Sequence, residues 1–589
     1  MHKIKMTNFQ IQFTDRSNVK NKLRKSQFSD KQTFDLTLNA FELLSKIKEN
    51  KLSITSSIKS NKSLELYDHQ IFAAMKVKNE FGGTAILADE VGLGKTVEAG
   101  IILKEFLISG LAKSVLILVP PSLVYQWQDE LETKFNLHFT QKDDFDYKNP
   151  SSHELLIFSH SSAVSPEKSE QLKKRNWDMV IVDEAHSMKN ASTHKHRFVK
   201  ELPRKFTLFL SATPIQNDLS ELYNLVELLK PGTFGTFSEF KTRYAEDASM
   251  RKVNSFFKDE LQEKLSKIII RTTREQVRKY ISFTDRIANT KILKPTDDER
   301  TLYDEITRRV QEYYDSGFDI LYLMVIQRLI SSSTESTKQA LFKMKQSELF
   351  EQTDYDELME IANRIKLDTK TKDLLDELNQ QPDSKFLIFT EFHVTQDYLA
   401  RILHEQGYSV TLFNGKMNLS ERSESVEKFR TTSQIMISTS AGGEGQNFQF
   451  CHNVVNYDLP WNPMRVEQRV GRVHRIGQKN NVNIFNYAYQ DTIDAYILQL
   501  LYTKIKLFTM TIGHLDLLFE DVTDEKTGTR FFKEYITSKN KQELENKFSA
   551  LGENLKNQKE NLTTAVEQFN HEVFENFSLS SLGENTVSN

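Results

Sequence analysis

The stretch Ile86 to Gly100, ILADEVGLGKTVEAG, decides the fold, because it contains an apolar strand, a glycine-containing turn and the start of a helix. A phosphate-binding loop requires these elements in this order. The turn ends in Gly94, Lys95 and Thr96 as such loops do, yet Asp89 stands where their first glycine usually lies. The sequence therefore raises the question of whether this loop binds a nucleotide.

The residue types of the turn suit phosphate binding. Gly92 and Gly94 let backbone N–H groups approach phosphate oxygens, and the following helix adds its positive end. Lys95 supplies a charge for the β and γ phosphates, and the Thr96 hydroxyl is a ligand for Mg²⁺. A simple glycine turn before a helix is the alternative. The predicted nucleotide-binding residues of the loop are Asp89, Glu90, Val91, Gly92, Leu93, Gly94, Lys95 and Thr96.

A second motif, MVIVDEAHSMKN, ends an apolar strand in Asp183 and Glu184. Ligands of parallel sheets bind at the carboxyl ends of the strands. We expect Asp183 to hold Mg²⁺ and Glu184 to polarise the attacking water. Upstream, Gln70 begins a helix before the loop strand, and its amide suits an adenine edge because it offers both a donor and an acceptor. A surface acidic pair and a solvated glutamine are the alternatives.

The pattern around these motifs predicts an α/β fold. Short apolar runs alternate with amphipathic helices from about residue 64 to 213, and a second such series begins near residue 372, which indicates parallel sheets covered on both faces. The expected fold class is therefore α/β, with two tandem parallel-sheet lobes, helical insertions and a helical C-terminal tail. The expected parts are an appendage and linker at 1–60, lobe 1 at 61–217, a helical insertion at 218–371, lobe 2 at 372–520 and the tail at 521–589.

Composition limits the class of protein. The chain has 38% hydrophobic and 27% charged residues, a net charge of −3 and one cysteine, Cys451. No apolar run approaches the roughly 18 residues of a membrane span, and no secretory signal is seen at the N-terminus. We expect a cytoplasmic monomer without membrane contact, in which any surface for nucleic acid is a local stripe. Cys451 is expected in the core.

The second series carries MRVEQRVGRVHRIGQ at residues 464–478. Arg472 and Arg475 stand three residues apart and Gln468 lies four before Arg472, so a helix would place them on one face. Arginines from a different lobe than the phosphate loop are typical of an arginine-finger mechanism. A basic helix face is the alternative. The predicted catalytic residues are Lys95, Asp183, Glu184, Gln468, Arg472 and Arg475, and the predicted metal ligands are Thr96 and Asp183.

Together these stretches resemble the Snf2 branch of superfamily 2 helicase-like ATPases, over roughly residues 64 to 513. LADEVGLGKTVEAGIILKEFL is similar to motif I, LILVPPSLVYQWQDEL to motif Ia, VIVDEAH (the DEAH box) to motif II and LSATPIQN to motif III. FLIFTEF, STSAGGEGQNFQFCHNVVNYDLPWNP and EQRVGRVHRIGQ are similar to motifs IV, V and VI. Within that family the sequence of motif I, DEVGLGKTVEAG, is most similar to that of bacterial RapA-like proteins. Asp89 and Glu90 are usual in the Snf2 loop, so the missing glycine marks a subclass of working sites.

The resemblance implies that the two parallel-sheet lobes are RecA-like. It also implies Mg²⁺-dependent ATP hydrolysis coupled to movement along double-stranded DNA, with displacement or remodelling of bound proteins. Contacts with DNA phosphates are then expected from motifs Ia, Ib, IV and V. The residues are Pro120, Ser122, Gln126, Ser159, Thr390, Thr439, Gly442 and Gly443. Two alternatives stay open: a strand-separating DNA or RNA helicase, and an ATP-switched partner of RNA polymerase or of a phage-defence complex.

Overall fold

The computed structural model describes residues 52–53, 66–90, 92–140, 154–211, 218–250, 252–281, 283–347, 352–439, 447–475, 477–501 and 524–554. The chain divides into two units, 1–52 and 53–589, and every helix and strand described belongs to the second. Apart from Leu52 and Ser53, the predicted appendage at 1–60 lies outside the described residues. The fold below is therefore that of the second unit.

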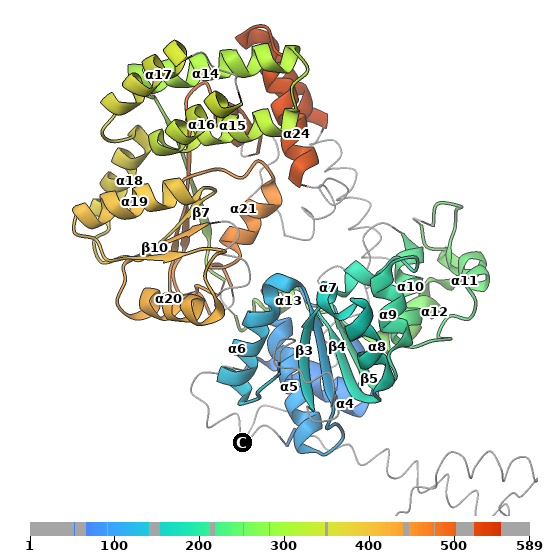
Figure 1. Cartoon of the computed structure of the whole chain (residues 1–589). Helices are drawn as coiled ribbons and strands as arrows, with labels where there is room; N and C mark the ends of the chain where they lie inside the picture. The colour runs from blue at the N-terminus through green and yellow to red at the C-terminus, as the bar shows by residue number, and fades with distance from the viewer. Residues whose placement is uncertain are drawn as a thin grey trace, which may run out of the picture. The chain divides into compact units, whose positions relative to one another are not determined.

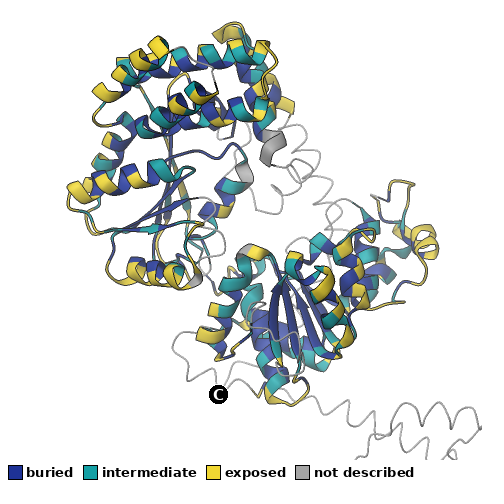
Figure 2. Ribbon diagram, in the orientation of Figure 1, coloured by how far each residue is buried: buried dark blue, intermediate teal, exposed yellow. Residues whose placement is uncertain are grey.

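The first sheet has six parallel strands in the order β3-β2-β4-β5-β1-β6. Its strands are β1 (Thr84–Leu87), β2 (Val115–Val119), β3 (Leu155–Ser159), β4 (Trp177–Val182), β5 (Arg204–Leu210) and β6 (Ile269–Ile270). All five residues of β2 are buried, as expected of a central strand covered on both faces. Figure 2 shows these strands in dark blue between helices that are yellow on their outer sides.

Helices surround the first sheet, as Figure 1 shows in blue and green. They are α4 (Asp68–Asn79), α5 (Lys95–Ile108), η1 (Pro121–Leu123), α6 (Val124–Phe135), α7 (His160–Ala163), α8 (Pro166–Lys174), η3 (Ala185–Met188), α9 (His194–Glu201), α10 (Leu219–Leu229), α11 (Phe237–Tyr244), η4 (Ser255–Phe257), α12 (Lys258–Ser266) and α13 (Arg274–Val277). The helices from α7 to α12 share one hydrophobic core with the strands, in which Trp177, Phe209 and Leu222 are buried.

The second sheet also has six parallel strands, in the order β7-β12-β11-β8-β10-β9. Its strands are β7 (Arg286–Leu293), β8 (Phe386–Thr390), β9 (Val410–Phe413), β10 (Ile435–Thr439), β11 (Asn453–Asn456) and β12 (Val482–Tyr489). The expected second α/β lobe is thus confirmed, and so is the α/β fold class. Cys451 is buried in this lobe, as expected, and burial raises the pKa of its thiol to about 12.

The helices of the second lobe fall into two groups. Those packed on its sheet are α18 (Thr369–Gln380), α19 (His393–Glu405), α20 (Leu419–Thr431), α21 (Pro463–Val470) and α22 (Ile493–Gln499). The others form a helical subdomain of α14 (Asp297–Asp315), α15 (Ile320–Ser332), α16 (Thr334–Gln346) and α17 (Gln352–Arg364). The subdomain shares a hydrophobic core with α22 and with α24 (Asp524–Ile536).

The range 218–371, predicted from sequence as a helical insertion, also contributes two strands. The first, β6, pairs with β1 at the edge of the first sheet, and the second, β7, pairs with β12 at the edge of the other. Both are hard to find in the sequence: β6 has two residues, and β7 is largely half-buried or exposed, with Ile287 43% exposed. The range is therefore shared between the two sheets.

The predicted helical tail lies partly within the described residues. Residues 541–554 are helical, and Leu544, Phe548 and Leu551 are buried in the core of the helical subdomain. Their spacing of four and three residues places them on one face of this helix. The predicted tail from residue 555 onward lies outside the described residues.

Among the helices that the structure describes, none is both long enough and apolar enough to cross a membrane.

Candidate nucleotide site

The phosphate loop leaves β1 and enters α5 through two glycines with left-handed backbone. Gly92 has φ +87° and Gly94 has φ +91°, which side chains rarely tolerate. A Cβ atom at Gly94 would also lie 2.6 Å from the Gln70 amide nitrogen. Gly94 is the N-cap of α5 and has no side chain with which to cap the helix. The first-turn N–H groups of α5 therefore suit an external anion.

Lys95 connects this loop with the acidic motif. Its ammonium donates to the Asp89 carbonyl oxygen at 2.8 Å. The same positive charge opposes the rise of the Asp183 pKa and contributes to the lowering of the Glu184 pKa, so the lysine acts electrostatically on both acids. Thr96 follows in the first turn of α5 and is half-buried. The structure thus brings together the two motifs that the sequence places about 90 residues apart.

Asp183 follows directly after β4 and is 7% exposed. Its Oδ2 atom accepts a hydrogen bond from Trp127 Nε1 at 2.8 Å, and Oδ1 accepts one from the Glu184 backbone N–H at 2.9 Å. Burial, and then the neighbouring Glu184 charge, raise the pKa of Asp183 against these hydrogen bonds. The carboxylate is therefore held in place but short of positive charge.

Glu184 occupies a left-handed backbone position at φ +48°, where the chain turns from β4 into η3. Burial opposes its ionisation, but the hydrogen bond and charge of His186, together with Lys95, outweigh burial and lower its pKa. His186 Nδ1 lies 3.2 Å from Glu184 Oε2. At neutral pH Glu184 is thus an ionised carboxylate, the form that can accept a proton from water.

The residues present fit a magnesium ion. Mg²⁺ prefers hard oxygen ligands such as carboxylates and hydroxyls, which Asp183 and Thr96 offer. The raised pKa of Asp183 means that a nearby cation would stabilise its ionised form. Asp183 and Thr96 would therefore hold the ion, which would supply charge neutralisation for the phosphates.

Asp89 and Glu90 bond to the chain that leaves the first sheet. Asp89 Oδ1 accepts the backbone N–H of Thr272 at 2.8 Å, and Glu90 Oε2 accepts that of Arg274 at 2.9 Å. Thr272 follows β6 and Arg274 begins α13, so both acids fasten the segment between the two sheets to the phosphate loop. The place of Asp89 and Glu90 in the nucleotide site remains a prediction. Val91 lies outside the described residues.

Gln70 is buried, and its amide is used within the protein. Its Nε2 donates to the Leu93 carbonyl at 3.2 Å, and its Oε1 accepts from the Tyr67 N–H at 3.2 Å. Leu93 itself is buried against Val277. Gln70 therefore positions the phosphate loop, and its contact with adenine remains a prediction.

A buried titratable cluster lies behind the loop. Ligand atoms of His69, Asp89 and Glu98 all lie within 4.8 Å of one another. His69 Nε2 is 3.0 Å from the Leu93 carbonyl oxygen, which identifies it as a donor to that oxygen. Burial and then Asp89 raise the pKa of Glu98 well above its ordinary value. Burial and the neighbouring Asp89 carboxyl thus both favour the protonated form of Glu98.

The residues predicted to contact nucleic acid differ in their access to solvent. Pro120, Gln126 and Ser159 are half-buried near the ends of β2 and β3. The Gln126 amide donates to Glu130 at 2.7 Å, and Ser159 Oγ caps α7 through the Ser162 N–H. Ser122 lies in η1, with its side chain outside the description.

In the second lobe, two predicted DNA contacts are turned inward. Thr390 is fully buried and its hydroxyl donates to Asp458, and its contact with DNA phosphates remains a prediction. Thr439 is 3% exposed at the end of β10. Gly442 and Gly443 lie outside the described residues.

The arginine motif begins on α21 and continues past its end. Gln468 is exposed on the helix, whereas Arg472 and Arg475 are half-buried in the turns that follow it. Arg475 Nε donates to the Gly471 carbonyl at 2.8 Å. The helix that the sequence predicts through all three residues therefore stops at Val470, before the two arginines.

Two charged residues of this motif that sequence reasoning missed are buried. Glu467 accepts two hydrogen bonds from Arg286 Nη1, at 2.8 and 3.1 Å. Arg469 donates from Nη2 to Glu391 Oε1 at 2.7 Å. Buried charges are found almost only in pairs, so a charged residue beside apolar Val466 and Val470 was the available signal.

Two family models match the chain. The SNF2-related domain matches residues 67–374, and the helicase conserved C-terminal domain matches residues 369–477. The first match spans more than half of the 589 residues. The chain belongs to the SNF2-related family.

Several proteins are similar to this SNF2-related chain. Uncharacterized ATP-dependent helicase YqhH of Bacillus subtilis (strain 168) is 40% identical over 454 residues, which cover 76% of this chain and 80% of that protein. RNA polymerase-associated protein RapA of Actinobacillus pleuropneumoniae serotype 3 (strain JL03) is 28% identical over 501 residues, which cover 78% of this chain and 52% of that protein. The chain spans about half the length of the RapA relatives that it matches.

Among solved structures, a Sulfolobus solfataricus SWI2/SNF2 ATPase core in complex with dsDNA is 24% identical, with 80% of this chain and 97% of that chain covered and a TM-score of 0.36.

The expected resemblance to Snf2-type superfamily 2 proteins, and to RapA-like members among them, is confirmed. The SNF2-related chain is an ATPase with a helicase-type C-terminal lobe. Lys95, Asp183 and Glu184 form its candidate nucleotide site.

Proposed function

We propose that this ATPase moves along double-stranded DNA in the cytoplasm and displaces or remodels proteins bound to it. The observation that supports this proposal most is the convergence of the Lys95 charge with Asp183 and Glu184 at the carboxyl edge of the first sheet. A phosphate loop and two acids in that arrangement suit hydrolysis of a nucleoside triphosphate held with Mg²⁺.

Each residue has a proposed role in hydrolysis. Lys95 and the N–H groups at the start of α5 bind the phosphates, and Thr96 and Asp183 hold Mg²⁺. Glu184, ionised at neutral pH, orients the attacking water and accepts its proton. Arg472 and Arg475 neutralise charge that develops in the transition state, with Gln468 as a further contact. Because they belong to the other lobe, hydrolysis is expected to require closure of the two lobes.

DNA would be bound through its phosphates, without reading of its sequence. The proposed contacts of the first lobe are Pro120, Ser122, Gln126 and Ser159, which lie at or after the ends of β2 and β3. Gly442 and Gly443 are proposed as the corresponding contacts of the second lobe. Binding through phosphates predicts an affinity that falls steeply with salt concentration.

The decisive experiment compares ATP hydrolysis with and without duplex DNA. We expect duplex DNA to raise the rate and Lys95→Ala to abolish it. Equal rates with and without DNA, or an active Lys95→Ala variant, would contradict the proposal. Displacement of the third strand of a DNA triplex then tests movement, because a translocase removes that strand and leaves the duplex annealed. Release of single strands from a duplex would instead favour the strand-separating helicase.

A protein partner is the second candidate function. The similarity to proteins named RNA polymerase-associated protein RapA favours RNA polymerase over a defence complex as the protein that this ATPase acts on. Co-purification of the full chain with RNA polymerase, with nucleotide and without, tests this proposal. Absence of polymerase from both preparations would contradict it.

A further inference from the structure

Helix α21 is fastened inside the second lobe by an arginine that precedes the proposed catalytic pair. The guanidinium of Arg469 stacks over the ring of Phe389, 5.1 Å from its centroid. Its Nη1 donates to Asn456 Oδ1 and to the Asp458 carbonyl, both at 2.9 Å, and its Nη2 donates to Glu391. Arg469 is 5% exposed, so its contacts lie within the lobe. They hold the helix on the carboxyl ends of β8 and β11.

Glu391 joins this helix to a second one. Its side chain is 7% exposed; Oε1 accepts from Arg469 at 2.7 Å and Oε2 accepts from Arg328 on α15. Arg328 also lies over the ring of Trp461, 5.7 Å from its centroid. One carboxylate therefore bridges α21 and the helical subdomain, and both of its oxygens are used.

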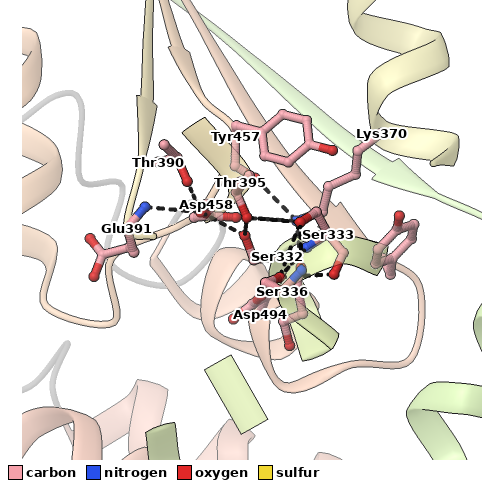
Figure 3. A network of polar contacts seen from close by, with 12 residues as sticks. Ser332, Ser333, Ser336, Lys370, Thr390, Glu391, Thr395, Tyr457, Asp458 and Asp494 are labelled. Carbon is pink, nitrogen blue, oxygen red and sulfur yellow. Dashed lines mark hydrogen bonds and ion pairs between the residues drawn. The ribbon is translucent and has the colours of Figure 1, made fainter. Parts of the chain in front are cut away.

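The backbone of Glu391 belongs to a second group of contacts, centred on Asp458 and shown in Figure 3. Its N–H donates to Asp458 Oδ2 at 2.9 Å, and the same oxygen accepts from the hydroxyls of Thr390 and of Ser332 at the end of α15. Ser332 therefore ties the subdomain to the strand ends through Asp458. The position of Glu391 is fixed at its backbone as well as at its side chain.

A buried lysine completes this layer. Lys370 has no exposed side-chain surface, and its ammonium lies 3.9 Å from Asp458 Oδ1. It donates to the carbonyls of Ser331 at 2.6 Å and Tyr457 at 3.1 Å. In Figure 3 Lys370 reaches from its helix toward Asp458 and the serines of α15. A positive charge thus sits at the carboxyl end of α15, where the helix dipole is negative.

The opposite side of α21 is also anchored. Arg286 of β7 pairs with Glu467 and donates from Nε to His474 Nδ1 at 3.0 Å, while His474 Nε2 donates to the Thr284 carbonyl at 2.7 Å. Two ionic contacts therefore hold α21, and the hydrogen bonds of His474 hold the turns that carry Arg472 and Arg475. Of these contacts, the one through Glu391 connects α21 to the helical subdomain, because Glu391 also accepts from Arg328 of α15.

We infer that Glu391 is a positioning residue for ATP hydrolysis: by joining Arg469 to Arg328 it fixes α21, and with it Arg472 and Arg475, relative to the helical subdomain. This inference rests on the proposed function, in which those two arginines meet the phosphates. Glu391 touches no nucleotide. It affects the geometry of the transition-state contacts, so its loss should lower kcat. Nucleotide binding, which is proposed to depend on the first lobe, should be retained.

The test is steady-state ATP hydrolysis with saturating duplex DNA, together with nucleotide affinity measured with a fluorescent ATP analogue. Glu391→Gln keeps the shape of the side chain and removes its charge. We expect kcat to fall roughly 10- to 100-fold, as small misplacements of catalytic groups do. KM for ATP and the affinity for the analogue should change less than about twofold, because uniform binding is retained.

A double-mutant cycle separates positioning from a general loss of stability. Arg328→Gln should lower kcat by itself, and adding it to Glu391→Gln should lower kcat little further, because both remove the same bridge. Arg309→Gln is the matched control: it breaks the 2.7 Å pair between Arg309 of α14 and Asp354 of α17, within the same subdomain. We expect Arg309→Gln to leave kcat unchanged.

Each outcome has a defined meaning. Normal kcat in Glu391→Gln, with activity abolished in Arg472→Ala, would overturn the inference and leave the proposed function standing. Activity retained in both Lys95→Ala and Arg472→Ala would overturn the proposed function itself. If circular dichroism shows that Glu391→Gln does not fold, Arg328→Gln decides alone, since Arg328 is 24% exposed and its replacement leaves the Arg469 pair in place.

Discussion

The carboxylate of Asp89 in the phosphate loop accepts the backbone N–H of Thr272, at 2.8 Å and 183 residues further along the chain. Thr272 lies between β6, the last strand of the first sheet, and β7, the first strand of the second. The loop that is proposed to bind ATP is thus hydrogen-bonded to the segment that connects the two lobes. A change in the loop on nucleotide binding would act directly on that connection.

Asp89→Ala is expected to weaken this connection. Loss of a buried hydrogen bond to a charged acceptor costs about 1.5–3 kcal/mol of unfolding free energy, and the loop should bind nucleotide less tightly. Urea denaturation and nucleotide titration measure the two effects. Asp178→Ala is the matched control. Asp178 Oδ2 also accepts backbone N–H groups, those of Lys113 at 2.8 Å and Ser114 at 3.0 Å, and these contacts do not involve the phosphate loop. It should lower stability alone; equal nucleotide affinity in both variants would contradict the prediction.

Lys95→Ala is expected to lower the rate of ATP hydrolysis by about 100- to 1,000-fold, the range for removal of one stabilising donor in an active site. Lys104→Ala, nine residues further along α5 and half-buried, is the control and should leave the rate unchanged. Hydrolysis measured by phosphate release at saturating ATP distinguishes the two. A comparable loss in both variants would mean that the effect comes from α5 as a whole.

Glu98→Gln should be tolerated, because burial and Asp89 raise the pKa of Glu98 and the amide replaces a neutral acid of the same shape. We expect its unfolding free energy to stay within about 1 kcal/mol of the original. Glu105→Gln is the contrast on the same helix: Glu105 is equally buried, but pairs with Lys78 at 2.7 Å. Weakening that pair should cost about 1–3 kcal/mol. A larger loss in Glu98→Gln than in Glu105→Gln would show that Glu98 is ionised.

The central strands could be predicted from the sequence because strands covered on both faces are continuous apolar runs, as in the buried VLILV of β2. The edge strands could not. An edge strand has one neighbour and one exposed side, so β7, RIANTKIL, has mixed polarity, and β6 is too short to form a pattern. As a result, the range assigned to a helical insertion contains one strand of each sheet.

Residues of the candidate site could be predicted from the sequence where the sheet topology fixes their position. They could not be predicted where a single long-range contact fixes it. Asp183 and Lys95 come together because parallel strands end at one edge of the sheet. The partner of Asp89 is 183 residues away, and local sequence carries no signal for it. On α21 the difference is one position: Gln468 is exposed, whereas Arg469 turns inward to Glu391, because adjacent helix positions lie about 100° apart.

The stability of the nucleotide-free protein should depend on pH through Asp183. Burial and Glu184 raise its pKa in the folded state, so the folded protein holds this proton to higher pH than the unfolded chain does. The stabilisation is present below the ordinary pKa of about 3.9 and is lost as pH rises through the raised value. Asp183→Asn removes the titration, and it should therefore raise the melting temperature at pH 8 more than at pH 5 while hydrolysis is lost. Asp178→Asn is the control: burial opposes the ionisation of Asp178, but hydrogen bonds from Ser114 and Lys113 outweigh burial and lower its pKa, so its loss should bring no such gain. A melting temperature for Asp183→Asn below that of the original protein at pH 8 would show that the hydrogen bond from Trp127 outweighs the buried charge.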